Sequence, residues 1–401
     1  MKKIIEQLKK GHIQTIFLVI LIYLICTRDK NKYDEIIIII LGIITLLKNF
    51  CNREYFKIDR KILYLIFFWI LIMTLSFFKM LILYPKGDYI ILYRNIIIDN
   101  FLLFFILTQI EFKEIRYKDR ILDFINILSL YAIYKGVIYI ENNGFFKIGA
   151  IWGHQNYYSM LIGIFSIISF GCFCFEKKKV YKLLYLVLYL SQLFMLISIG
   201  QSRNVFLALC ISYISYLILI NWKENKKRVF KILLFTLVIM SIGFFILKLN
   251  NLRVVDISIE KFINNPRILI WKKCLIDEKF NLFFGKGFAY YIMNKFKDSV
   301  GVTIWALHND SLEFLVTQGI FSMLLYWGFI FYFMKSFLVD FLHTQNKMSL
   351  ITFILVLYFF MIGMLDLPFY WKRISQFIFL FLGMNIHREK RKIKDEKKYN
   401  F

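Results

Sequence analysis

Apolar runs recur along the whole chain, and short polar stretches separate them. A helix that crosses a bilayer needs about 20 consecutive, mostly apolar residues. The pattern therefore predicts an all-α, polytopic membrane protein with about twelve transmembrane helices and one large external loop. The expected spans are 13–27, 35–50, 62–80, 89–110, 121–140, 156–175, 181–199, 204–222, 229–248, 310–338, 348–366 and 374–387.

The same pattern divides the chain into four parts. Residues 1–248 hold the first nine predicted helices, and 308–387 hold the last three. Between them lies the only long polar stretch, the predicted external loop 249–307. Residues 388–401 form a basic tail.

Composition and charge agree with a membrane protein. Hydrophobic residues make up 59% of the 401 residues, against roughly 45–50% in soluble domains. The net charge of +25 could indicate nucleic-acid binding, but the basic residues are dispersed over short loops. Cytoplasmic loops of membrane proteins carry such an excess of Lys and Arg. The bias predicts that both termini are cytoplasmic, that loop 249–307 is external, and that no nucleic acid is bound.

The external loop contains one predicted amphipathic helix. Asn265 is suited to cap it, and Pro266 suits the first helical position. Apolar residues then recur at helical spacing at Ile268, Trp271, Cys274 and Leu275. Further on, Gly285-Lys286-Gly287 predicts a turn.

His308 is the leading catalytic candidate. It comes directly after the predicted external loop, and Asn309, Asp310 and Glu313 follow within five residues. A neutral imidazole can accept a proton from a hydroxyl near neutral pH. The alternative is an interfacial histidine without chemistry. The chain lacks His and Cys ligand spacings, so we expect neither a metal nor another cofactor.

Arg203 and Arg267 are the candidates for binding an anion. Arg203 lies in a tight external connection between two spans, and Arg267 opens the amphipathic helix. A guanidinium group binds phosphate oxygens through two parallel hydrogen bonds. A membrane anchor at Arg203 and a solvated charge at Arg267 are the alternatives.

Other polar residues on the external side are supporting candidates. Arg94 and Asp99 could pair within a span or line the same cavity. The remaining supporting candidates are Gln201, His154 and Asn156.

Three sequence elements resemble the O-antigen ligase and O-antigen polymerase family of membrane glycan transferases. They are Gln201–Asn204, Arg267–Lys272 with the downstream Gly285–Gly287, and His308–Asn309 followed by Gly319. The resemblance covers about residues 150–340. Ser322 departs from the ligase pattern, and this departure favours a polymerase. The compact His308 element favours a ligase.

The resemblance implies an enzyme of the bacterial inner membrane with its active site on the external face. The donor would be a glycan on undecaprenyl diphosphate, with the diphosphate bound by Arg203 and Arg267. The acceptor would be a hydroxyl of the lipid A core or of another lipid-linked repeat unit. His308 would orient or deprotonate that hydroxyl, and the anomeric carbon would invert.

Two other classes of function remain open from the sequence. Twelve spans with both termini inside also suit a transporter or flippase of lipid-linked oligosaccharide. Such proteins show repeat symmetry and ionisable groups near the membrane midplane, whereas the polar residues here favour one face. A structural or sensor protein would not require Arg203, Arg267 and His308 to come together.

Overall fold

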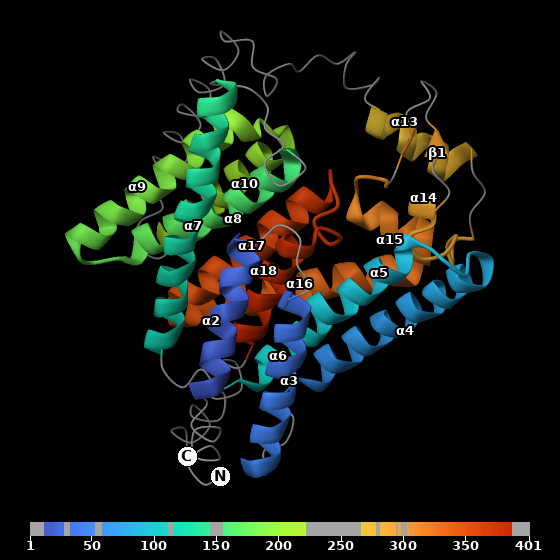
Figure 1. Ribbon diagram of the computed structural model, residues 1–401, viewed down its shortest axis with the longest axis horizontal. Helices are drawn as coiled ribbons and strands as arrows, with labels where there is room; N and C mark the ends of the chain where they lie inside the picture. Colours follow the sequence, from blue (N-terminus) through green and yellow to red (C-terminus); the bar gives the residue numbers. More distant parts are fainter. Residues whose placement is uncertain are drawn as a thin grey trace.

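The computed structural model describes residues 12–27, 33–52, 58–110, 115–144, 155–221, 266–277, 281–293, 296–297, 303–304 and 306–386. These parts are mainly helical, as the sequence predicts (Figure 1). The first nine helical segments are α2 (His12–Thr27), α3 (Tyr33–Asn52), α4 (Arg60–Leu83), α5 (Asp88–Asn95), the π-helical η1 (Ile96–Leu102), α6 (Leu103–Gln109), α7 (Ile115–Asn143), α8 (Gln155–Phe175) and α9 (Lys179–Met195). The others are η3 (Leu196–Gly200), α10 (Arg203–Asn221), α13 (Pro266–Lys272), η5 (Lys273–Asp277), α14 (Tyr290–Met293), α15 (Asp310–Gln318), α16 (Ile320–Thr344), α17 (Lys347–Gly363) and α18 (Lys372–Asn385).

Seven helical stretches in the described ranges are long and apolar enough to cross a membrane. They are 60–83, 88–109, 118–143, 156–175, 179–200, 203–221 and 320–344. Two further apolar helices, Ile13–Thr27 and Lys347–Gly363, are shorter. The predicted span 229–248 lies outside the described residues. The structure therefore supports a polytopic membrane protein.

The predicted continuous span 310–338 is wrong. The chain forms two helices, α15 and α16, separated by Gly319 with a φ of 93°. The N–H of Ile320 donates to the carbonyl of Leu282 at 2.8 Å. The helical hydrogen-bond ladder is thus interrupted where another segment supplies the acceptor.

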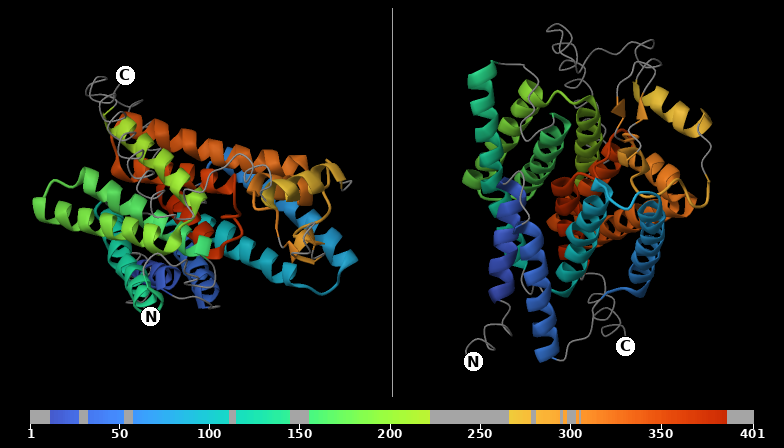
Figure 2. Two further views of the ribbon diagram at one scale, coloured as in Figure 1. Left: turned by 90° about the horizontal axis from the view of Figure 1, so that it is seen from above. Right: turned by 45° about the vertical axis from the view of Figure 1, so that its right-hand side comes forward.

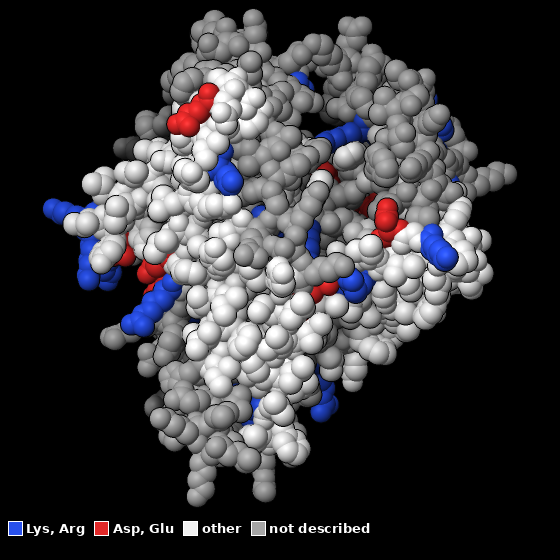
Figure 3. Space-filling view, viewed as in Figure 1, with Lys and Arg blue, Asp and Glu red and all other residues white. Residues whose placement is uncertain are grey.

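The helices form two groups that meet at the centre of the molecule. α8 is the most buried span, with 78% of its apolar window inside the protein. It packs against α7, α9, α10 and α17. In the other group, α4 lies beside α15 and α16 (Figures 1 and 2). On the face shown in Figure 3, the described residues are mostly uncharged, and their acidic and basic side chains occur in scattered groups.

Trp69 of α4 lies at the centre of the aromatic core of the second group. It is fully buried, and its Nε1 donates to Ser322 Oγ of α16 at 3.2 Å. Its ring lies 5.3–5.5 Å from the rings of Phe101, Phe314, Phe329 and Phe369. Aromatic pairs at such separations stabilise a core beyond the area that they bury. Four segments are therefore fixed around one side chain.

A helix, α13, begins at Pro266, where the sequence predicts one, and continues into η5. Asn265 lies outside the described residues. The buried side differs from the prediction, because Ile270 and Cys274 are buried whereas Leu275 is 40% exposed. Two short antiparallel strands, β1 (Phe296–Lys297) and β2 (Thr303–Ile304), pair Phe296 with Ile304.

Candidate active site

Asp366 is the centre of a polar cluster that the sequence analysis did not anticipate. It lies in the connection between α17 and α18, and its side chain is only 3% exposed. Its carboxylate accepts a hydrogen bond from Asn156 Nδ2 at 2.8 Å and lies 3.4 Å from His308 Nδ1. Arg267 Nη2 lies 3.6 Å from it. One carboxylate thus joins α8, α13 and the start of α15.

The environment of Asp366 keeps its carboxylate charged. Burial raises its pKa, but the hydrogen bond with His308 and the positive charge of Arg267 have the opposite effect. The N–H of Leu367 also donates to Oδ1 at 2.9 Å. The result is a pKa below the ordinary value of an aspartate.

His308 is held at the start of α15. Its φ of 51° is left-handed, a conformation that is uncommon for a residue with a side chain. Asn309 caps α15 by accepting from the N–H of Leu312 at 3.0 Å. Its amide also donates to the carbonyl of Met364 at 2.8 Å. The His308 side chain remains 37% exposed, so its ring is accessible beside the buried Asp366.

Arg267 reaches the same connection from the first turn of α13. Besides its ion pair with Asp366, its Nη1 donates to the carbonyl of Leu365. The Arg267 side chain is 24% exposed. A guanidinium presents its five N–H donors in a fixed planar fork, the geometry that matches phosphate oxygens.

Arg203 lies at the start of α10, next to this cluster. Its neighbour Asn204 donates to the carbonyl of Leu365 at 3.1 Å, the same oxygen that Arg267 contacts. Arg203 itself is exposed. The predicted tight connection is confirmed, with buried Gln201 at a φ of 42° between η3 and α10. The structure thus brings the beginning of α10 to the connection that carries Asp366.

Asp310 and Glu313 face the protein interior rather than the exposed side of His308. Asp310 is fully buried, and its Oδ2 lies 3.3 Å from Tyr326 Oη and 3.4 Å from the N–H of Phe369. Glu313 Oε2 accepts from the N–H of Leu307 at 3.1 Å. Burial raises the pKa of Asp310 well above its usual range and that of Glu313 to about 7. Both carboxyls therefore suit structural roles.

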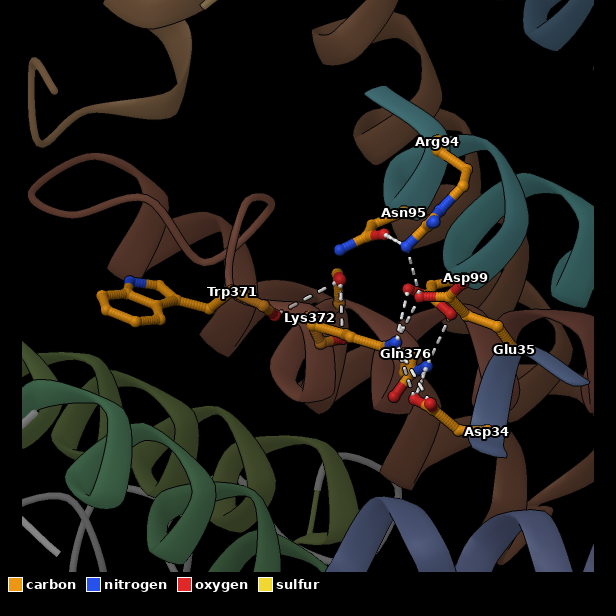
Figure 4. A network of polar contacts seen from close by, with 9 residues as sticks. Asp34, Glu35, Arg94, Asn95, Asp99, Trp371, Lys372 and Gln376 are labelled. Carbon is orange, nitrogen blue, oxygen red and sulfur yellow. Dashed lines mark hydrogen bonds and ion pairs between the residues drawn. The ribbon is translucent and has the colours of Figure 1, made fainter. Parts of the chain in front are cut away.

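Arg94 belongs to a second polar network, shown in Figure 4. Its Nη2 lies 3.2 Å from Glu35, whereas Asp99 is paired with Lys372 at 3.2 Å. Lys372 also contacts Asp34 at 3.0 Å and Glu35 at 3.1 Å. Arg94 therefore pairs with Glu35, and Asp99 pairs with Lys372, rather than Arg94 and Asp99 pairing with each other. A small pocket beside it is lined in part by Asn95, Asp99, Asn100, Tyr370 and Lys372.

Asn156 and His154 are the remaining candidates. Asn156 and His308 both contact the carboxylate of Asp366. His154 lies outside the described residues. The available signal for Asp366 was a single acidic residue at the end of the predicted span 348–366. In the described ranges, no group of three or more His, Cys, Asp or Glu side chains is arranged to hold a metal.

Part of this site lies in a segment that matches the model of a known family. Residues 184–327, about a third of the chain, match the family model described as O-antigen ligase. The match includes Arg203, Arg267 and His308, whereas Asn156 and Asp366 lie outside it. No curated protein sequence matches the chain. The match at residues 184–327 is to the same family that the motifs of this chain resemble.

Proposed function

We propose that the protein transfers a glycan from undecaprenyl diphosphate to a sugar hydroxyl during synthesis of a surface polysaccharide. The acceptor is the lipid A core in a ligase or another lipid-linked repeat unit in a polymerase. The enzyme lies in the bacterial inner membrane, with both termini in the cytoplasm and with loop 249–307 and the site on the external face. The family match and the apolar helices support this proposal.

The observation that carries the proposal is the shared contact of His308 and Arg267 with Asp366. A proton acceptor and a phosphate-binding group come from distant parts of the chain to one buried carboxylate. Asn204, adjacent to Arg203, reaches the neighbouring Leu365. Such convergence is expected of an active site and counts against a purely structural or sensor role.

In the proposed reaction, the acceptor oxygen attacks the anomeric carbon and forms the new glycosidic bond. The bond between that carbon and the diphosphate oxygen breaks, and its electron pair leaves with the diphosphate. Asp366 holds a proton on Nδ1 of His308, so Nε2 can take the proton of the acceptor hydroxyl. Arg203 and Arg267 bind the diphosphate and stabilise its growing negative charge. Neither a metal nor a nucleotide takes part in this scheme.

The test is a gel of the surface glycan from a deletion strain. The strain is complemented with wild type, His308→Ala or His343→Ala at equal protein levels. His343 is an exposed residue in the last turn of α16 and serves as the matched control. We expect the normal ladder with wild type and His343→Ala, and loss of the ladder with His308→Ala.

The product that accumulates distinguishes the two acceptors. A single repeat unit on the core indicates a polymerase, whereas long chains left on the carrier lipid with a bare core indicate a ligase. A normal ladder with His308→Ala would refute the catalytic assignment. Failure to extrude the lipid-linked unit to the external face would instead favour a flippase.

A further inference from the structure

Three consecutive large apolar residues are exposed in a turn outside the spanning helices. Leu282, Phe283 and Phe284 have exposed fractions of 48%, 55% and 69%. None of the three belongs to a candidate span. Contiguous exposed apolar surface of this kind marks a site that contacts another protein or a membrane.

The turn is built to hold these side chains outward. Asn281 Oδ1 accepts from the N–H groups of Phe283 at 2.9 Å and Phe284 at 3.1 Å. The N–H of Gly285 donates to the carbonyl of Asn281 at 2.7 Å. Asn side chains stabilise turns through such local hydrogen bonds. We name residues 281–285 the aromatic turn.

The aromatic turn is joined directly to the junction between α15 and α16. The N–H groups of Lys286 and Gly287 each donate at 2.8 Å, to the carbonyls of Val316 and Thr317. A Cβ atom at Gly285 would lie 2.4 Å from the backbone of Thr317, and one at Gly319 would lie 2.0 Å from the Phe283 carbonyl oxygen. Both glycines therefore permit a backbone approach that a side chain would block.

The exposed side chains continue the apolar surfaces of two candidate spans. The Phe283 ring lies 6.0 Å from that of Phe321 at the start of α16, which is itself 51% exposed. On the other side, Lys79 Nζ of α4 donates to the carbonyl of Gly285 at 2.8 Å. Beyond it, Ile82 at the end of α4 is 81% exposed. Since α4 and α16 are candidate spans, a bilayer around them would meet the aromatic turn.

We propose that the aromatic turn inserts Leu282, Phe283 and Phe284 among the acyl chains of the outer leaflet. Segments that lie on a membrane surface bury Phe and Leu side chains at the boundary between headgroups and acyl chains. The turn accepts a hydrogen bond from the N–H of Ile320 at Leu282, and the next two residues donate to α15. Through these bonds the inserted turn stabilises α15, the helix that begins beside His308. Insertion itself is independent of the reaction, whereas its effect on His308 rests on the proposed function.

Lipid contact is tested by spin labelling of the full-length protein in phospholipid nanodiscs. A ketone-bearing phenylalanine analogue replaces Phe284 and carries a nitroxide label, so the native cysteines remain in place. The control carries the same label at the exposed Lys86, in the connection between α4 and α5. Oxygen concentrates among acyl chains, whereas a nickel chelate remains in water.

We expect oxygen to relax the label at 284 at least several-fold more than the nickel chelate does. At Lys86 we expect the reverse order. Equal access of the nickel chelate to both labels would overturn insertion. A label at 284 that neither reagent reaches would also overturn it and would indicate a contact with a second copy.

The link to the site is tested with Phe284→Asp and Phe284→Leu in the complemented strain. We expect Phe284→Asp to lose most of the glycan ladder at equal protein level and Phe284→Leu to retain it. A normal ladder with Phe284→Asp would overturn the link to His308. The nitroxide result is independent of glycan transfer, so failure of insertion can be distinguished from failure of the proposed function.

Discussion

His308 Nδ1 lies 3.4 Å from Asp366 Oδ1, although the two residues belong to different connections between helices. This contact gives the imidazole a fixed partner on one ring nitrogen. It also links the segment that matches the family model to a residue outside that segment.

Replacement of Asp366 by Asn should impair transfer more than folding. The amide can still fill the site, but it no longer holds the His308 proton through a negative charge. Removal of a partner that orients a functional histidine costs about 10- to 100-fold in related settings. We expect a loss of this size in transfer by the purified enzyme in proteoliposomes. Asp88→Asn, at the exposed first residue of α5, is the control. Equal rates for both variants would contradict the role of Asp366.

Arg267→Ala should remove a large part of the stabilisation of the leaving diphosphate. Loss of one donor to a developing negative charge costs about 3 kcal/mol, on the order of 100-fold in rate. Arg267→Lys should retain part of the rate, since a lysine preserves the charge without the two-pronged geometry. The measurement is kcat/KM for the lipid-linked donor, with Arg60→Ala at the start of α4 as the control. An unchanged kcat/KM in Arg267→Ala would assign Arg267 to structure alone.

Gly319→Ala should destabilise the protein strongly. The residue has a φ of 93°, and its new Cβ would meet the carbonyl oxygen of Phe283 at 2.0 Å. Gly328→Ala, within α16, is the matched control because its Cβ would lie 3.5 Å from Leu65. In a helix interior, that change is expected to be neutral or stabilising, by up to about 1 kcal/mol. Thermal unfolding in detergent should show a large fall in Tm only for Gly319→Ala.

Glu313 should make the protein less stable as the pH rises. Burial raises its pKa from 4.5 to about 7 in the folded state. The folded state therefore binds the proton more tightly, and its advantage is lost as the pH rises from about 4.5 through 7. The difference amounts to about 3 kcal/mol. Glu313→Gln retains an oxygen for the N–H of Leu307 but cannot ionise.

Unfolding at pH 5.5 and pH 8 measures this effect. We expect Tm to fall more between the two values in wild type than in Glu313→Gln. Parallel changes in the two proteins would show that Glu313 does not ionise in this range.

Lys372→Met should destabilise the network of Figure 4. Lys372 lies 3.0–3.2 Å from Asp34, Glu35 and Asp99, whose side chains are at most 11% exposed. Removal of one partner from a buried ion pair costs about 3–5 kcal/mol, because the opposite charge stays behind. Adding Asp99→Asn to Lys372→Met should restore part of the lost stability. The measurement is thermal unfolding of the single and double variants. Equal Tm values for both would show that an unpaired charge on Asp99 does not cause the loss of stability.

The sequence was sufficient for the helical class, because long apolar runs leave few alternatives in a bilayer. It also placed the helix that begins at Pro266, since proline favours the first helical turn. The break at Gly319 was missed because apolar residues continue on both sides of it. Only contact with Leu282, a distant segment, supplies the competing hydrogen bond.

Only part of the candidate site could be predicted from the sequence, because the rest depends on contacts between distant segments. His308 and Arg267 carry recognisable chemistry, so their residue types marked them. Asp366 has no local pattern, and its importance depends on which distant residues surround it. The same holds for Lys372, whose three carboxylate partners come from α3 and η1.

Because Asp366 lies outside residues 184–327, the segment that matches the family model would be incomplete if it were isolated. A fragment limited to residues 184–327 would keep Arg203, Arg267 and His308 but would lose Asn156 and Asp366. Its histidine would then lack a counter-charge, and Arg267 would lack its anionic neighbour. We therefore expect the smallest working unit to be larger than the matched segment 184–327 and to extend at least from α8 to the connection before α18.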